Sequence, residues 1–394
     1  MFTALRLPFV TMTSMLPPLK RYYRPELDAL RFCAFLSVFL FHGMEYYIPD
    51  AFSHMETYHL AWAGQWGVPM FFLLSAFLIV ELLLRESDGT GTVHLKAFYI
   101  RRILRIWPLY FFAFYSFALL NLFIPKVNPH VGTTWPYFTF FLGNWYISRH
   151  DWIAGPVDPL WSISVEEQFY LFIPIIIVLG GRRALRIASV IVLVVAYWAI
   201  YRYARITWTV DNGEWTNSLV MFQFFAGGAL LAMALGGRVP QWKWPTRLIA
   251  FAAGLTCWIV AQTVFGVRGW EPFTTVAQAF SGWPLILIGC VLFLLSFLGI
   301  TANRIPKWIA YLGRISFGLY VYHSLIYMLI FRYAAPHIWS LQQPNSPWHL
   351  PIVWALILCV LAISISIAYL SYNLLEKPFL RIKERFAIVP SRPE

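Results

Sequence analysis

Two ionisable residues lie inside the first strongly apolar stretch of the sequence, LRFCAFLSVFLFHG at residues 30–43. Arg31 stands near the start of this stretch and His42 near its end, eleven residues apart. On an α-helix this spacing turns about 20° past three full turns, so both side chains share one face, about 16 Å apart along the axis. An Arg at the centre of a membrane span costs about 2.5–3.5 kcal/mol. The alignment therefore favours a face toward a water-filled tunnel, and the alternative is that each side chain snorkels to its nearer interface.

A second apolar stretch, LWSISVEEQFY at residues 160–170, carries the adjacent carboxylates Glu166 and Glu167. Their side chains point about 100° apart on a helix, so at least one must meet a cation, a hydroxyl or a titrating group inside the bundle. Both lie near the outer end of their span, at the depth expected for His42. Glu166 has Tyr170 one turn further on, which favours Glu166 as the partner of His42 and Glu167 as a packing residue. The alternative is an ion pair that only fixes two helices together.

A basic cluster, Arg101, Arg102 and Arg105, lies in KAFYIRRILRIWPLY, which we place in the loop before the third span. The planar guanidinium group pairs bidentately with phosphate. The cluster therefore predicts a clamp for a phosphorylated ligand at the cytoplasmic mouth, on the side of Arg31. The alternative is that these residues only mark a cytoplasmic loop.

Two further polar positions interrupt the last apolar segments. RISFGLYVYHSLI places His323 in the middle of a span, where it is either a hydrogen-bonded packing residue or part of the site. YNLLEKPF ends the last span with Glu376 and Lys377 before Pro378, which predicts a helix stop with a charge pair.

The elements that position these residues are predicted from composition. The chain has 394 residues, of which 59% are hydrophobic and only 12% charged. Soluble domains carry about 25% charged residues. The formal charge of +12 is explained by basic cytoplasmic loops, so no nucleic-acid partner is expected. The four cysteines lie in apolar runs without CxxC spacing, which predicts neither a disulfide nor a metal site. Residues 1–24 lack the pattern of a signal peptide.

We therefore predict an all-α polytopic membrane protein with about ten transmembrane helices and one domain over residues 1–394. The stretch 133–147 is too short and interrupted to span, and we interpret it as re-entrant or interfacial. With it excluded, 23 of the 30 Lys and Arg residues fall on one side, which puts both termini in the cytoplasm, including segment 1–24 and tail 380–394. The predicted spans are 27–46, 66–84, 106–124, 161–180, 184–203, 217–236, 247–266, 276–299, 315–333 and 350–372.

The chain resembles the acyltransferase type 3 family of integral-membrane O-acyltransferases. Three residues depart from the family pattern, Pro69, Ala76 and Asn373, and none is a proposed site residue. The matches run in order over nearly the whole chain and are specific as a set. They are PELDALRFCAFLSVFLFHG with its Arg-x10-His pattern, GVPMFFLLSAFLI, FYIRRILRIWPLY, LWSISVEEQFYL, ISFGLYVYH and LLEKPF.

The resemblance implies an acyl-CoA donor, commonly acetyl-CoA, and a hydroxyl acceptor on a carbohydrate, glycan or other metabolite. No permanently bound cofactor is expected. A bacterial inner membrane is the expected location, and the absence of an added hydrolase-like domain makes a stand-alone transferase the expectation. The sequence names neither the acceptor nor the oligomeric state.

The residues supply a compatible mechanism. Arg101, Arg102 and Arg105, with Arg31, would hold the phosphates of acyl-CoA. His42 would act as general base, since an imidazole pKa near about 6.5 suits neutral pH. One of the two glutamates would orient His42, and His323 or Tyr320 would donate to the thioester oxyanion. The rival from another class is a proton- or ion-coupled transporter using the same buried Arg, His and Glu residues, but the inverted repeat typical of many such folds is not evident.

Overall fold

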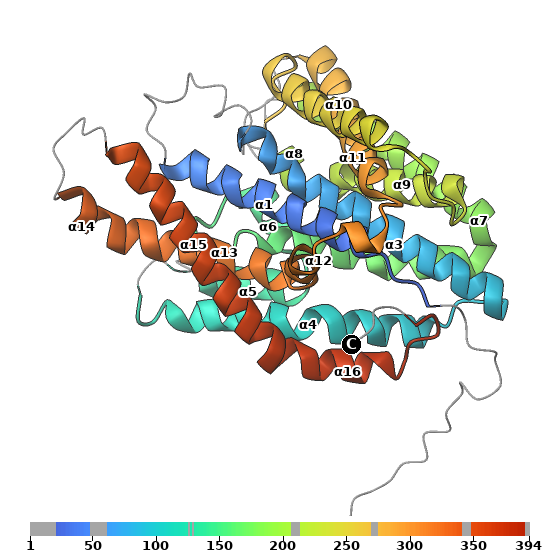
Figure 1. The fold of residues 1–394 in the computed structure, drawn as a ribbon, viewed down its shortest axis with the longest axis horizontal. Coiled ribbons are helices and arrows are strands. Elements are labelled where there is room, and N and C mark those ends of the chain that lie inside the picture. The colour runs from blue at the N-terminus through green and yellow to red at the C-terminus, as the bar shows by residue number, and fades with distance from the viewer. Residues whose placement is uncertain are drawn as a thin grey trace, which may run out of the picture.

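The computed structural model describes residues 21–47, 61–124, 127, 130–205, 213–268, 275–340 and 348–390. The first twenty residues and the last four of the predicted cytoplasmic ends lie outside these ranges. Within the described residues every regular element is a helix, so the all-α prediction is confirmed (Figure 1). The helices are α1 (Pro25–Tyr47), η2 (Ala63–Trp66), α3 (Gly67–Thr90), α4 (Leu95–Leu120), α5 (Val131–Thr139), α6 (Gly143–His150), α7 (Leu160–Arg205), α8 (Gly213–Thr216), α9 (Ser218–Leu235), α10 (Trp244–Thr263), α11 (Val276–Phe297), η3 (Ala302–Arg304), α12 (Lys307–Arg314), α13 (Ser316–Leu329), η4 (Ile330–Ala334), α14 (Ala335–Ser340), α15 (His349–Ser371), η5 (Tyr372–Glu376) and α16 (Lys377–Glu384).

The described part of the chain contains eight helices that are long and apolar enough to cross a membrane, or nine if the bent pair α12–α13 counts as one span. The helix α7 is 46 residues long and contains a break, with Gly180 at φ −161° and Gly181 at φ +56°. Each half is about 30 Å long at 1.5 Å per residue, enough for one crossing. By length and composition, the described helices supply ten spans, as predicted from the sequence, when α7 is counted twice and the bent pair α12–α13 once.

The stretch predicted to be re-entrant or interfacial forms two short helices, α5 and α6. They are 9 and 8 residues long, and Phe141 between them has φ +55°. Neither reaches the roughly 20 residues that a spanning helix needs. The stretch therefore does not cross as a single helix, as the charge pattern predicts.

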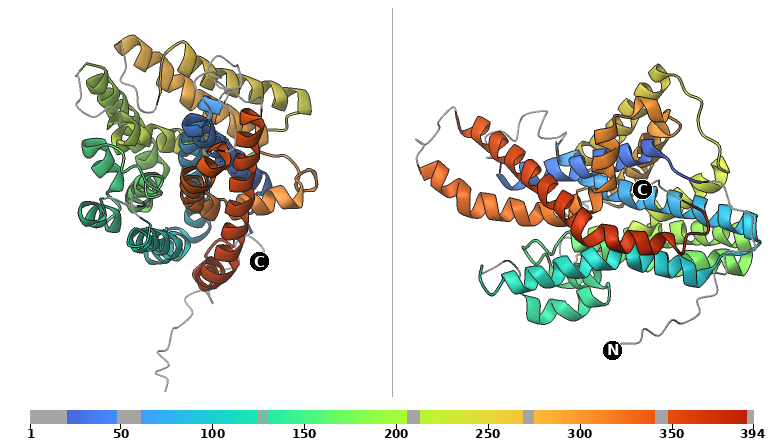
Figure 2. Two further views of the ribbon diagram at one scale, coloured as in Figure 1. Left: turned by 90° about the vertical axis from the view of Figure 1, so that its left-hand side faces the viewer. Right: turned by 60° about the horizontal axis from the view of Figure 1, so that its bottom comes forward.

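Helix α1 runs through the interior of the bundle (Figure 2). Its backbone is approached closely at two places. A Cβ at Gly64 would lie 2.2 Å from the Ser37 carbonyl oxygen, and one at Gly313 would lie 1.8 Å from the Asp28 carbonyl oxygen. Only glycine allows such contacts. Helix α1 is thus fixed by backbone contacts at its start, beside Asp28, and at its middle, beside Ser37.

Two predicted boundaries are wrong. The Arg cluster does not lie in a loop, because α4 begins at Leu95, before the apolar core of the span. Hydropathy detects the lipid-facing length of a helix and misses charged turns beyond it. The last helix also does not end before Pro378. The helical path continues from α15 through the π-helical turn η5 into α16. A proline in the first turn of a helix costs little, since its missing N–H has no helical partner there.

Candidate functional site

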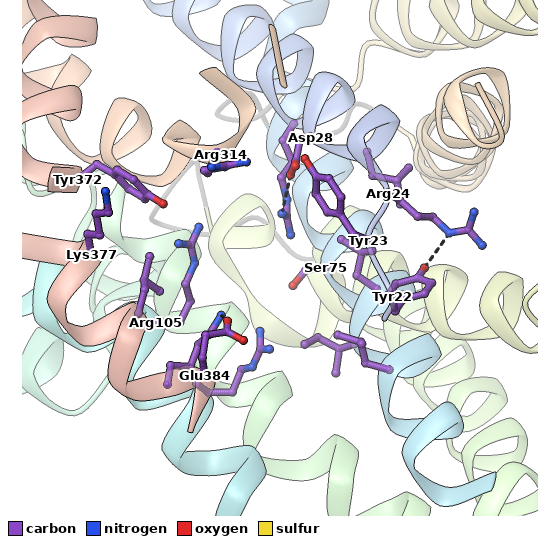
Figure 3. A pocket seen from close by; sticks show the side chains of 18 of the residues that line it. Tyr22, Tyr23, Arg24, Asp28, Ser75, Arg105, Arg314, Tyr372, Lys377 and Glu384 are labelled. Atoms are coloured by element: carbon purple, nitrogen blue, oxygen red, sulfur yellow. Dashed lines mark hydrogen bonds and ion pairs between the residues drawn. The ribbon is translucent and has the colours of Figure 1, made fainter. Parts of the chain in front are cut away.

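A cavity of about 270 Å³ opens at the end of the bundle where the N-terminal segment, α4, α12 and α16 meet (Figure 3). The walls are strongly basic, with eight cationic side chains and two acidic ones, Asp28 and Glu384. A concave site with this surplus of positive charge suits a ligand that carries several negative charges. The cations are Arg24, Arg31, Arg102, Arg105, Arg314, Lys377, Arg381 and Lys383.

Three of the four arginines predicted to hold phosphate line this cavity. Arg31 reaches it from α1 and forms a 3.5 Å ion pair with Asp28, while Arg102 and Arg105 reach it from α4. Arg101 does not line it. One nitrogen of Arg101 donates to the Phe386 carbonyl oxygen at 2.8 Å and the other to Glu86 at 3.1 Å.

Sequence reasoning missed five cations of the cavity. Arg24 and Arg314 come from a loop and a short helix, and Lys377, Arg381 and Lys383 come from α16. The one available signal was the i, i+4 spacing of Lys377 and Arg381, which places both on one helix face.

A group of interacting polar side chains, Tyr22, Arg24 and Glu81, lies at the side of the cavity formed by the N-terminal segment. Tyr22 lines the cavity and donates its hydroxyl hydrogen to Glu81. Burial and the neighbouring charge of Glu81 raise the pKa of Tyr22, so this side chain stays a neutral donor. Arg24 lies 3.9 Å from the same carboxylate.

Two hydroxyl side chains also line the cavity, Ser75 of α3 and Tyr170 of α7. Both hydroxyls hydrogen-bond to the same oxygen of Glu166. The i, i+4 pair of Glu166 and Tyr170 therefore faces the cavity side of α7, as its spacing predicts. Glu167 points elsewhere and accepts a 3.1 Å hydrogen bond from the indole nitrogen of Trp107 on α4. The structure brings Glu166 to Ser75 and Tyr170, and it brings His42 to a different partner.

That partner is His323 of α13. The Nδ1 atom of His42 lies 3.0 Å from Nε2 of His323, and the two rings stack with centroids 5.1 Å apart. His323 is fully buried, whereas His42 retains some exposure. Residues 281 positions apart in the chain thus meet as a pair at the opposite end of α1 from Arg31.

The hydrogen bonds fix which nitrogen of each ring carries a proton. Nδ1 of His323 lies 2.6 Å from the carbonyl oxygen of Tyr320, which only accepts, so this nitrogen donates. Nε2 of a neutral His323 is then an acceptor, and Nδ1–H of His42 donates to it. Nε2 of His42 is left with its lone pair, as a general base requires.

The pair is anchored to the segment before α7. The hydroxyl of Tyr320 donates to the Pro159 carbonyl oxygen at 3.1 Å and lies 2.8 Å from the Ser162 hydroxyl. Asp158 holds this segment by accepting from the backbone nitrogens of Ile153 at 2.9 Å and Gly155 at 3.2 Å. Burial raises the pKa of Asp158 to about 7, although these hydrogen bonds act in the opposite direction.

The arrangement separates two chemical capacities along α1. A basic cavity lies at the Arg31 end, and a histidine whose neutral ring has an unprotonated Nε2 lies at the His42 end, about 16 Å away by helical rise. Among the described residues no group of three or more His, Cys, Asp or Glu side chains could hold a metal ion. The residues at hand suit proton transfer at a distance from a site for an anionic group.

Comparison with known proteins gives a consistent picture. A family model described as an acyltransferase domain matches residues 24–371. YrhL of Bacillus subtilis, named as a candidate peptidoglycan O-acetyltransferase, is 28% identical over 386 residues, covering 90% of this chain and 55% of that protein. The peptidoglycan O-acetyltransferase OatA of Listeria monocytogenes is 26% identical over 389 residues, covering 91% of this chain and 56% of that protein.

The chain thus spans about half the length of these two curated relatives. A further relative, a candidate O-acetyltransferase of Staphylococcus aureus, is 32% identical over 166 residues, which is 40% of this chain and 25% of that protein. No solved structure matches.

Proposed function

This chain belongs to the acyltransferase family that its residues 24–371 match, and from that membership we propose an integral-membrane O-acyltransferase that moves an acyl group from acyl-CoA to a glycan hydroxyl. The observation that carries the proposal is the position of the basic cavity and the histidine pair at opposite ends of α1. Acyl-CoA has the matching shape, with several phosphate charges at one end and a thioester at the end of a long arm. The names of the relatives support an acetyl group and a peptidoglycan-like acceptor.

The cavity would bind the nucleotide end of the donor. Arg102 and Arg105 lie one turn apart on α4, and Arg31 faces the same space from α1. Each guanidinium group can pair with a phosphate. The arm would then extend along the Arg31–His42 face past Ser75 and Tyr170, which line the cavity.

His42 would perform the proton transfer. Its unprotonated Nε2 takes the proton of the acceptor hydroxyl, whose oxygen attacks the thioester carbonyl carbon. The carbon–sulfur bond then breaks, an ester forms, and the leaving thiolate of CoA takes the proton from the imidazolium. His323 accepts the hydrogen bond from Nδ1–H of His42, which orients the ring and stabilises its charged form.

We propose that the cavity faces the cytoplasm, where acyl-CoA is available, and that the histidine pair lies toward the outer face. Four of the basic segments that the charge rule assigns to the cytoplasm, those containing Arg24, Arg102, Arg314 and Arg381, supply cations to the cavity. The backbone N–H of Tyr22 donates to the Pro390 carbonyl oxygen at 2.8 Å, so the two ends of the described chain lie at this same face. A bacterial inner membrane with both termini cytoplasmic fits these contacts.

The test is turnover by the full chain purified into lipid nanodiscs. With acetyl-CoA and a soluble peptidoglycan disaccharide, we expect release of free CoA thiol and an acetylated product detected by mass spectrometry. The His42→Ala variant should form both at least about 100-fold more slowly, and Tyr322→Phe, one position from His323, serves as the control for altered packing. Ion flux in proteoliposomes without consumption of acetyl-CoA would support the transporter alternative and overturn the proposal.

A further inference from the structure

The C-terminal segment, residues 377–390, forms one wall of the basic cavity. It supplies three of the eight cations, Lys377, Arg381 and Lys383, and its helix α16 packs along α4 (Figures 1 and 3). We propose that this segment is part of the donor-binding site, and that Arg101 is the positioning residue that fastens it there and does not itself bind a phosphate. The inference rests on the proposed function.

The contacts of Arg101 hold the C-terminal segment in place. Its guanidinium group donates to the carbonyl oxygen of Phe386 at 2.8 Å and to Glu86 at 3.1 Å. The Arg101 side chain is only 12% exposed and that of Glu86 2%. Glu86 is itself held by the backbone N–H of His94 at 2.7 Å. Arg101 therefore joins the start of α4 to the C-terminal segment through buried hydrogen bonds.

A second anchor lies four residues further on. The Tyr22 N–H donates to the Pro390 carbonyl oxygen at 2.8 Å, and Val389 is 8% exposed. The turn after α16 is thus held at Phe386 by α4 and at Pro390 by the N-terminal segment. These two points fix α16 over the cavity.

Electrostatics explains why a fastening is needed. Like charges around the cavity repel one another until a polyanion occupies it. The segment supplies three of these cations and one acid, Glu384, which lies 3.1 Å from Lys383. Its remaining positive charge is repelled by the other cations of the cavity, so a contact that adds no uncompensated charge is needed to hold it. Arg101 provides such a contact because it binds a backbone carbonyl oxygen and has its own charge compensated by Glu86.

Binding of CoA by isothermal titration calorimetry separates the roles of Arg101 and Arg102. Arg101→Met and Arg102→Met should each weaken CoA binding by about tenfold, the effect of losing one charged hydrogen bond. The comparison is with a background in which the segment is neutralised, Arg381→Gln with Lys383→Gln. There Arg101→Met should have little further effect, whereas Arg102→Met should still cost about tenfold, because only Arg101 acts through the segment.

Limited proteolysis of the full chain gives a readout independent of ligand. Trypsin should cut after Arg381, Lys383 or Arg385 several-fold faster in Arg101→Met than in the native chain, and CoA should protect the native chain. Arg101→Lys keeps a single donor and should lie between the two, which also serves if Arg101→Met folds poorly. Arg186→Met, which removes an exposed charge outside the cavity, should change neither measurement.

The outcomes are distinguishable. Failure of the native chain to bind CoA overturns the proposed function itself. Normal CoA binding by the native chain, combined with an Arg101→Met effect that persists in the neutralised background, shows that Arg101 binds the donor directly and overturns the inference. Unchanged tryptic cleavage in both Arg101 variants overturns it as well.

Discussion

Replacement of His323 by alanine tests the tautomer assignment at the histidine pair. The variant removes the acceptor for Nδ1–H of His42, which lies 3.0 Å from Nε2 of His323. That hydrogen bond strengthens when His42 becomes charged in the transition state. A hydrogen bond to a charged group contributes about 1.5–3 kcal/mol, and 1.36 kcal/mol is about tenfold in rate. We therefore expect kcat to fall by about 10- to 150-fold with little change in the KM for acyl-CoA.

Three companion variants make the expectation specific. His42→Ala should cost about 10²- to 10⁴-fold, the usual contribution of a general base. The double variant of His42 and His323 should be no slower than His42→Ala, because His323 acts only through His42. His323→Gln retains an acceptor near the position of Nε2 and should recover part of the lost rate. The control is again Tyr322→Phe, whose hydroxyl donates to Ser371 and not to the pair.

The assay is release of CoA thiol by the full chain in nanodiscs, with acetyl-CoA varied at saturating acceptor. A His323→Ala variant within about threefold of the native rate would remove His323 from the mechanism, since a lost charged hydrogen bond costs more. Additive losses in the double variant would show that the two histidines act on different groups.

Three further predictions concern the cavity, the glutamates and the loop before α7. Arg102→Ala and Arg105→Ala should each raise the KM for acyl-CoA about tenfold with kcat nearly unchanged. The control is a donor that lacks the nucleotide phosphates. If native and variant proteins prefer acyl-CoA over this donor by the same factor, the phosphates bind elsewhere. Glu166→Gln should lower turnover and Glu167→Gln should mainly lower the melting temperature, because their contacts are to the cavity and to Trp107 respectively; equal loss of turnover would mean a coupled pair. Asp158→Asn should remove a pH dependence of stability. Burial raises the pKa of Asp158 to about 7, above about 3.9 in the unfolded chain, so the folded state binds more protons in between and loses stability as pH rises. The variant should therefore gain in melting temperature relative to the native chain from about pH 5 to about pH 8, and a constant difference would contradict the assignment.

The sequence predicts most of the fold because lipid imposes strong rules on it. Hydropathy gives the spans, and a period of 3.6 residues places Arg31 and His42 on one face. The same period pairs Glu166 with Tyr170. These are relations within single helices, where spacing alone determines geometry.

Contacts between different helices cannot be predicted from the spacing of residues within one helix. Nothing in the spacing of one helix says that His42 meets His323, or that Glu166 meets Ser75 of α3. The contribution of α16 was missed for a different reason, because Pro378 was interpreted as a helix stop. Arg101 and Arg102 are adjacent and chemically identical, and only tertiary contacts distinguish a residue facing the cavity from one facing Phe386.

The backbone contacts at Gly64 and Gly313 have a consequence for the membrane around the protein. Bilayers differ in thickness, and single helices adapt to them by tilting or kinking at modest cost. Helix α1 is held at its start and at its middle by main-chain contact at Asp28 and Ser37, so it should keep its tilt when the lipid is changed. The separation between the cavity and the histidine pair would then be set by the protein alone. Turnover should accordingly be the same in short-chain and long-chain phosphatidylcholine, whereas alanine at either glycine would make it depend on lipid length.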